Sequence, residues 1–193
     1  MATVVLDFSI SLDGYIATPD DRLGGEDGEL LHRWFWEGGA MDRPEGLLWQ
    51  GGTSATIGAM LCGRRLYDLM DGWGGDHPVR RVPLFVVTHR APPDAIPKGP
   101  TAITFVMDGI ERAVALAREA AGNKNVYVIG GAQLADSLLD AGLLDEIRLH
   151  IVPVLLRDGV RLFGASGGSE IGLEQVEVVS EPEVTHVRYR VGR

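Results

Sequence analysis

The chain has one cysteine in 193 residues, and this scarcity excludes several kinds of chemistry. Cys62 alone cannot form an internal disulfide or a cysteine-based zinc site, and we expect it to act as a small buried hydrophobic residue. No apolar run approaches the roughly 18 residues that suggest a membrane span. The first residues also lack the basic segment and apolar stretch of a signal peptide. We therefore expect a cytoplasmic protein in a reduced setting, with no metal site and no membrane contact.

Positive charge is also scarce. Lysine and arginine number 18 against 27 aspartates and glutamates, which gives a formal net charge of -9. A surface this acidic repels polyphosphate backbones, so we expect no nucleic-acid partner. An anionic ligand would instead need a local cluster of cations and backbone N–H groups. The length and the 45% share of hydrophobic residues fit one globular domain over residues 1–193.

Hydrophobic patterning predicts an α/β architecture. Eight strands are expected at 3–10, 55–62, 83–88, 102–106, 126–129, 146–156, 173–179 and 184–191. Helices are expected at 30–36, 64–70, 110–121 and 132–141, the third of them capped by Asp108. Pro153 suggests that the long strand 146–156 lies at an edge or carries a bulge. The alternation of strands and helices predicts a mixed, mostly parallel eight-stranded sheet covered on both faces.

A glycine pair marks the junction between the strand 126–129 and the helix that follows it. Ligands of open α/β sheets bind beyond the carboxyl ends of the strands. Glycine lets a backbone approach a phosphate closely, and the free N–H groups of a helix start favour an anion. The residues concerned are Ile129, Gly130, Gly131, Ala132 and Gln133. The alternative is a tight turn that needs glycine only for its backbone angles.

A second junction of this kind follows the strand 55–62 and carries Gly63, Arg64 and Arg65. Arginine binds phosphate through a planar, charge-assisted fork. Two arginines oppose the dipole at a helix start, where acids are preferred, and an anion nearby would resolve the mismatch. The alternative is a pair of solvated surface arginines.

A third junction, Thr88, His89 and Arg90, ends the strand 83–88. A hydroxyl, an imidazole and a guanidinium together suit a sugar phosphate, although an ordinary polar loop would look the same. Three such junctions on one fold, each at the expected end of a strand, favour a dinucleotide site more than any one of them does alone.

Candidate residues for substrate chemistry lie elsewhere in the chain. Asp13 follows the first strand and could relay a proton or bind the nitrogens of a heterocycle, but an Asp-Gly turn with Gly14 would explain it equally. Trp34 and Trp73 could stack on a flat ring as substrate walls. Aromatic residues at helical spacing are also common in simple hydrophobic cores.

Five motifs carry a family resemblance over nearly the whole chain. They are SISLDGYIA (9–17), CGRRLY (62–67), VVTHR (86–90), VIGGAQ (128–133) and DEIRL (145–149), followed by Pro153 and the pair 162–163. In this order and spacing the chain resembles the dihydrofolate reductase superfamily, particularly the reductase domain of the bacterial riboflavin-biosynthesis deaminase–reductase. The resemblance implies a three-layer αβα sandwich, NADPH as hydride donor and a homodimer, in which the apolar strand 147–156 could supply the interface.

The resemblance also implies roles for individual residues. Gly63, Arg64 and Arg65 would hold the cofactor phosphates, and we expect the loss of Arg65 to weaken NADPH more than NADH. The third junction, Thr88, His89 and Arg90, would lie beside the adenosine ribose, and Ala17 would lie near the nicotinamide. The pyrophosphate would bind at the glycine pair and its neighbours, Ile129, Gly130, Gly131, Ala132 and Gln133. Such family members often have a cis peptide bond between the two glycines. An arginine on the 2′-phosphate fits the cationic junctions, since NAD sites place an acid on the ribose.

These observations lead to two hypotheses for function. The first is an NADPH-dependent oxidoreductase that reduces a small planar heterocycle (a pterin, pyrimidine or flavin-like ring), with Asp13 as the acid–base or anchoring group. The second is a non-catalytic protein that binds a nucleotide or planar ligand on the same fold. Residues 18–20 stand where dihydrofolate reductases carry a tryptophan, so folate is not the expected substrate.

Overall fold

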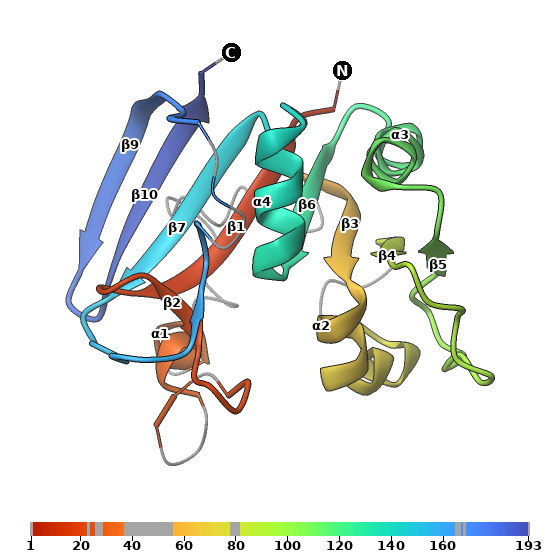
Figure 1. The fold of residues 1–193 in the computed structure, drawn as a ribbon, viewed down its shortest axis with the longest axis horizontal. Helices are drawn as coiled ribbons and strands as arrows, with labels where there is room; N and C mark the ends of the chain where they lie inside the picture. The colour runs from red at the N-terminus through yellow and green to blue at the C-terminus, as the bar shows by residue number, and fades with distance from the viewer. Residues whose placement is uncertain are drawn as a thin grey trace.

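A single eight-stranded sheet organises the chain (Figure 1). The computed structural model describes residues 2–22, 24–25, 29–36, 56–77, 82–164, 167 and 169–192. The strands run in the order β5-β4-β3-β6-β1-β7-β10-β9. Their bounds are β1 (Val4–Ser11), β3 (Ile57–Gly63), β4 (Leu84–Val87), β5 (Ile103–Val106), β6 (Asn125–Gly130), β7 (Glu146–Val152), β9 (Leu173–Glu181) and β10 (Val184–Val191). The predicted mixed sheet of eight strands is confirmed.

Strand direction follows from the connections between strands. The five neighbouring pairs from β5 to β7 are parallel, because helices or long segments return the chain to the same end of the sheet. The pairs β7–β10 and β10–β9 are antiparallel, and a tight turn joins β9 to β10. A two-stranded ribbon of β2 (Tyr15–Ala17) and β8 (Val160–Arg161) was not predicted. These strands have three and two residues, too short for a clear alternation.

Helices cover both faces of the sheet and make three layers. The helices α3 (Ile110–Ala121) and α4 (Ala132–Asp140) pack on one face, where Ala113 and Leu138 join Leu6 of β1 in the main core. Val5 points to the other face because side chains alternate along a strand. There it packs with Tyr67 of α2 (Arg64–Leu69).

The same second face is covered beside α2 by a 3₁₀ turn, η1 (Leu30–His32), that continues into α1 (Arg33–Trp36). Leu31 and Trp34 pack there against Val152 and Val184 of β7 and β10. The helical segment predicted over 30–36 is therefore confirmed. Cys62 is fully buried, as expected, and burial raises the pKa of its thiol to about 12.

Two local predictions were wrong. The residue that caps α3 is Gly109, with φ of 95° and no side-chain cap, and not Asp108. A positive φ favours glycine, so Asp108 precedes the cap by one residue. The strand β7 ends at Val152, so Pro153 follows it and forms no bulge within it. Both edges of β7 are hydrogen-bonded, to β1 and β10, so it is not an edge strand.

The contact between β3 and α3 generates a testable prediction. A Cβ atom added at Gly58 would lie 2.6 Å from both the Cα and the carbonyl oxygen of Ala121. Gly58→Ala should therefore lower the free energy of unfolding by about 1–3 kcal/mol, because the helix must move away from the strand. Gly172→Ala is the control, since no atom lies within 4 Å of its Cβ position. Equal stability of the two variants in urea unfolding would contradict this packing.

Candidate functional site

Two helices begin side by side at the carboxyl ends of neighbouring strands. The strand β3 runs into α2 through Gly63, and β6 runs into α4 through Gly131. Because the capping residue is a glycine in both cases, no side chain at that position caps the helix. A Cβ atom built on Gly63 would lie 3.7 Å from the backbone nitrogen of Gly131. The first N–H groups of a helix have no partner within the helix and attract negative charge. The two helix starts thus form one concentrated source of backbone donors.

The two glycines at this junction, Gly130 and Gly131, differ in the space that a side chain would find at each position. A Cβ on Gly130 would lie 2.2 Å from Cδ2 and 3.2 Å from Cβ of Leu66, so the packing of α2 on β6 leaves no room for a side chain. A Cβ on Gly131 would meet no atom within 4 Å. The peptide bond between the two glycines is cis. Of the remaining residues in this motif, Ile129 is half-buried, Ala132 is buried and Gln133 is exposed.

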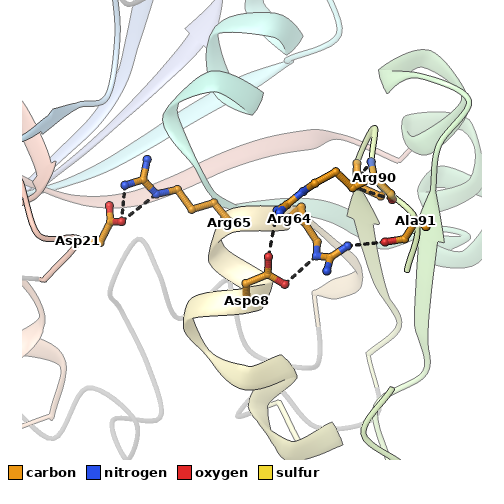
Figure 2. A network of polar contacts seen from close by, with 7 residues as sticks. Asp21, Arg64, Arg65, Asp68, Arg90 and Ala91 are labelled. Carbon is orange, nitrogen blue, oxygen red and sulfur yellow. Dashed lines mark hydrogen bonds and ion pairs between the residues drawn. The ribbon is translucent and has the colours of Figure 1, made fainter. Parts of the chain in front are cut away.

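Arg64 is held firmly at the start of α2 (Figure 2). Its Nε donates to Oδ1 of Asp68 at 2.7 Å, and its Nη1 donates to the carbonyl oxygen of Ala91 at 2.7 Å. The guanidinium also lies 5.7 Å from the ring centre of Phe105, and only 15% of the side chain is exposed. These contacts place a cation between the ends of β3 and β4.

Arg90 approaches the same carboxylate from the end of β4. Its Nη2 lies 3.0 Å from Oδ2 of Asp68, so Asp68 joins Arg90 to Arg64 (Figure 2). The turn before it is fixed by Thr88, which is buried and whose hydroxyl accepts from the Arg90 backbone N–H at 3.0 Å. His89 is exposed. The structure therefore brings the second and third junctions together.

Arg65 points away from this pair and bonds a different acid. Its Nε donates to Oδ2 of Asp21 at 2.8 Å, and its Nη2 forms an ion pair with the same oxygen (Figure 2). The Arg65 side chain is 69% exposed. Two carboxylates, Asp21 and Asp68, balance two of the three guanidinium charges of Arg64, Arg65 and Arg90. One positive charge therefore remains here, in a chain that is strongly acidic.

Asp13 is occupied by hydrogen bonds within its own loop region. Its Oδ1 accepts from the Ser11 hydroxyl at 2.6 Å and from the Leu156 N–H at 3.1 Å, and its Oδ2 accepts from the Arg157 N–H at 2.8 Å. The bond from Ser11 and the backbone N–H bonds lower the pKa of the carboxyl group. This arrangement ties the loop after β1 to the segment after β7. Ala17 lies nearby on β2 and is half-buried.

The two candidate tryptophans lie in different clusters. Trp34 is buried, and its Nε1 donates to Oγ of Ser9 and to the Leu31 carbonyl oxygen, each at 3.1 Å. Trp73 is half-buried after α2, with its ring centre 4.7 Å from that of His77. Trp34 belongs to the cluster around Leu31, Val152 and Val184, and Trp73 packs against the cluster around Tyr67. Their role as substrate walls stays a prediction.

Sequence analysis did not single out three polar residues on the face that carries Trp34. Asp7, His150 and His186 come from β1, β7 and β10 and form a hydrogen-bonded row. Ser9, His150 and His186 are aligned in register across the three strands. The signal available in the sequence was an acid and two hydroxyls, Asp7, Ser9 and Ser11, at alternate positions of a strand whose other residues are apolar.

One match with a family model identifies the family to which the chain belongs. The model of the RibD C-terminal domain matches residues 2–187. The chain belongs to the RibD C-terminal domain family. Two proteins of Bacillus subtilis (strain 168) are similar to it. YyaP is 29% identical, and the alignment covers 83% of this chain and 79% of YyaP. YwjB is 26% identical, and the alignment covers 82% of this chain and 81% of YwjB. Both are uncharacterized.

Solved structures share the fold of this RibD C-terminal domain. A Shewanella sp. PV-4 protein named for riboflavin biosynthesis is 23% identical, with a TM-score of 0.75 and full coverage of both chains. The dihydrofolate reductase of Enterococcus faecalis, solved with NADP(H) and RAB-propyl, is 14% identical over 99% of this chain and 97% of its own, with a TM-score of 0.59. The three-layer dihydrofolate reductase-like fold is confirmed. Among the described residues, no helix is long and apolar enough to cross a membrane, and no cluster of side chains could hold a metal ion.

The bonds of Asp13 generate the second prediction. Asp13→Ala removes the acceptor shared by the Leu156 and Arg157 amides, so both amides should exchange hydrogen at least about tenfold faster, as freed loops do. Asp20→Ala is the control, because Asp20 bonds only the neighbouring Thr18 among the contacts described. Unchanged protection at Leu156 and Arg157 in the Asp13 variant would contradict the proposed tie between the two loops.

Proposed function

We propose that this member of the RibD C-terminal domain family is an NADPH-dependent oxidoreductase that reduces a small planar heterocycle, such as a pterin, pyrimidine or flavin-like ring. One observation carries the proposal. Two helices without side-chain caps begin side by side at the carboxyl ends of β3 and β6, where a Cβ atom built on Gly63 would lie 3.7 Å from the Gly131 nitrogen, and three arginines lie around them. An acidic chain would not gather this much positive potential in one place without an anionic ligand to use it.

The residues present fit the phosphates of a dinucleotide. The open side of Gly131 leaves space for a group against the backbone, and the N–H groups after Gly63 and Gly131 are suitable donors for a pyrophosphate. Thr88, His89 and Arg90 are suited to the adenosine ribose, and Ala17 to the nicotinamide end. NADPH would supply the hydride when bound, while the protein supplies binding, orientation and exclusion of water.

The geometry favours Arg64, with Arg90, as the group that recognises the 2′-phosphate. Both guanidiniums contact Asp68 of α2, and Arg64 also bonds the carbonyl oxygen of Ala91 after β4, near Thr88, where the ribose is proposed to bind. Arg65 extends the other way, toward Asp21. It is better placed for the pyrophosphate, which NADH and NADPH share. This proposal differs from the sequence-based expectation for Arg65, and the nucleotide affinities of the two variants decide between them.

A second function, binding without catalysis, is favoured by one observation. The carboxylate of Asp13 already accepts three hydrogen bonds from its own chain, which leaves it little capacity to act on a substrate. Steady consumption of NADPH with a heterocyclic acceptor would exclude this alternative. Binding of NADPH with no turnover of any pterin, pyrimidine or flavin would favour it.

We also propose a homodimer, as the resemblance implies, and a cytoplasmic location, as the composition of the sequence predicts. Because both edges of β7 are already paired, the strand itself cannot extend a sheet across two copies. Leu155, which is 60% exposed just after this strand, is the residue of the segment 147–156 best placed for a contact.

The third prediction tests the cofactor. We expect NADPH to quench the protein's tryptophan fluorescence with an affinity at least roughly tenfold above that of NADH, which is about 1.4 kcal/mol. Arg64→Ala should remove most of this difference, whereas Arg65→Ala should weaken both nucleotides alike. Arg112→Ala, on the exposed face of α3, is the matched control. If neither nucleotide binds, the reductase proposal fails, and equal losses of both nucleotides in the Arg64 variant would remove its role in recognising the 2′-phosphate.

A further inference from the structure

Three of the chain's five histidines gather at one short segment, η1 and α1 over residues 30–36, which we call the cover. His150 of β7 is 2% exposed and His186 of β10 is fully buried, and their Nδ1 atoms lie 2.6 Å apart. The Trp34 ring of the cover lies over both imidazoles, at 4.7 and 5.0 Å between ring centres. His32 is half-buried on the cover itself. Because the ordinary pKa of histidine is close to neutral pH, this cluster is suited to sensing pH.

The hydrogen bonds of the buried pair limit the number of protons that it can hold. Nε2 of His150 lies 3.2 Å from Oδ1 of Asp7, and a carboxylate can only accept, so His150 donates from Nε2. One of the two Nδ1 atoms must donate to the other. A charged imidazole carries a proton on both nitrogens, so two charged rings would place two protons between Nδ1 atoms that are 2.6 Å apart. At least one histidine of the pair therefore stays neutral while the cover is closed.

Burial keeps His186 and His32 neutral near pH 7. Burial, followed by the neighbouring His150, lowers the pKa of each to about 4, against an opposite effect of Asp7. Nε2 of His186 is buried with no hydrogen-bond partner among the described residues, so a proton added there would find no acceptor. If the cover opened, both rings would meet water and regain the ordinary histidine pKa of about 6.5. Opening would then take up protons.

Other charged groups on this face of the sheet do not accept these protons. The titratable or charged groups around the histidines are Asp7 on β1, Tyr127 on β6, Glu146 and Arg148 on β7, Arg188 on β10, Glu177 and Glu181 on β9, and Arg33 on the cover. Arg148 is opposite Asp7 in the register, and it donates to Glu146 and to the Tyr127 hydroxyl. Among the described residues, Asp7 is the only acid that is hydrogen-bonded to a histidine of the cluster, and its bond is to His150. No carboxylate is therefore in place to balance a proton on His32 or His186.

The cover is attached less firmly than the strands beneath it. Leu31 and Trp34 pack with Val152 and Val184 in a cluster apart from the two larger cores. The Trp34 indole donates to Oγ of Ser9. The cover adds no strand to the sheet. A segment with a small apolar cluster and no place in a ladder of strands opens more easily than the core.

We propose that the cover is acid-sensitive: it leaves β1, β7 and β10 when His32 and His186 take up protons, while the sheet stays folded. Well above pH 6.5, both rings are neutral whether the cover is closed or open, so the cover has its full stability. As the pH falls from about 6.5 toward 4, the open state binds protons that the closed state excludes, and that stability is lost. The proposal requires neither NADPH nor a substrate, so it does not depend on the proposed reductase activity.

The size of the effect follows from the number of protons taken up. Two histidines that titrate near 6.5 in the open state and near 4 in the closed state should raise the open fraction about 200-fold between pH 6.5 and pH 5. One such histidine should raise it about 15-fold over the same range. The pH dependence therefore counts the rings that take part.

Hydrogen exchange of the ¹⁵N-labelled protein measures the opening directly. The probes on the cover are the Trp34 indole N–H and the His32 amide, which donates to the Glu29 carbonyl oxygen. The Val126 amide of β6, bonded to the Thr3 carbonyl oxygen, is the reference for the sheet. After correction for the intrinsic pH dependence of exchange, protection on the cover should fall about 200-fold from pH 6.5 to pH 5, and protection of Val126 should fall far less.

Two variants remove the titrating rings one at a time. His186→Asn keeps an N–H donor for Nδ1 of His150 but cannot take up a proton, and His32→Gln removes the ring on the cover. Each should reduce the fall in Trp34 protection to about 15-fold, and the double variant should abolish most of it. His89→Gln, at an exposed position, is the matched control and should keep the full fall.

Three results would overturn the proposal. The first is protection of Trp34 that does not change with pH, and the second is a full fall that persists in His32→Gln. The third is an equal fall at Val126, because that is global unfolding, in which the buried His77, with a pKa that burial lowers to about 4, also titrates. If His186→Asn does not fold in a thermal unfolding test, His32→Gln decides alone, since its fall must decrease from about 200-fold to about 15-fold.

Discussion

The close approach of two strand ends is the constraint on which the rest of the site depends. Because β3 and β6 are neighbours and both run into helices through glycines, the two helix starts lie against each other. Gly130 makes this possible, since Leu66 of α2 occupies the space that a side chain there would need. The backbone donors of two helices are then directed into one region, where their partial charges add.

Paired acids control the arginines around this region. Asp68 holds Arg64 and Arg90 together, and Asp21 holds Arg65, which is 44 residues away in sequence. Without these acids, the three guanidiniums would repel one another, and the two at the start of the six-residue helix α2 would oppose its dipole. With them, an anion would meet cations that are already oriented, and Arg65, whose side chain is 69% exposed, would exchange the Asp21 carboxylate for the proposed phosphate.

The sheet and the convergence of its glycine- and arginine-bearing strand ends could be predicted from the sequence because both depend on local signals. Buried strands appear as β-branched runs, and glycines and arginines mark their ends. The ribbon of β2 and β8 gave no such signal because its strands are too short. The row of Asp7, His150 and His186 depends on strand register across segments up to 179 residues apart, which composition and periodicity do not determine. The partners that occupy Asp13 come from a distant loop for the same reason.

Hydrogen exchange with and without NADPH tests the central claim, that the two helix starts together hold the cofactor phosphates. The account predicts slower exchange at the first amides of both helices, residues 64–66 and 131–133, and no change at the exposed loop around Asp94. Protection at only one helix start, or at neither, would contradict the claim that the junctions of β3 and β6 form one site.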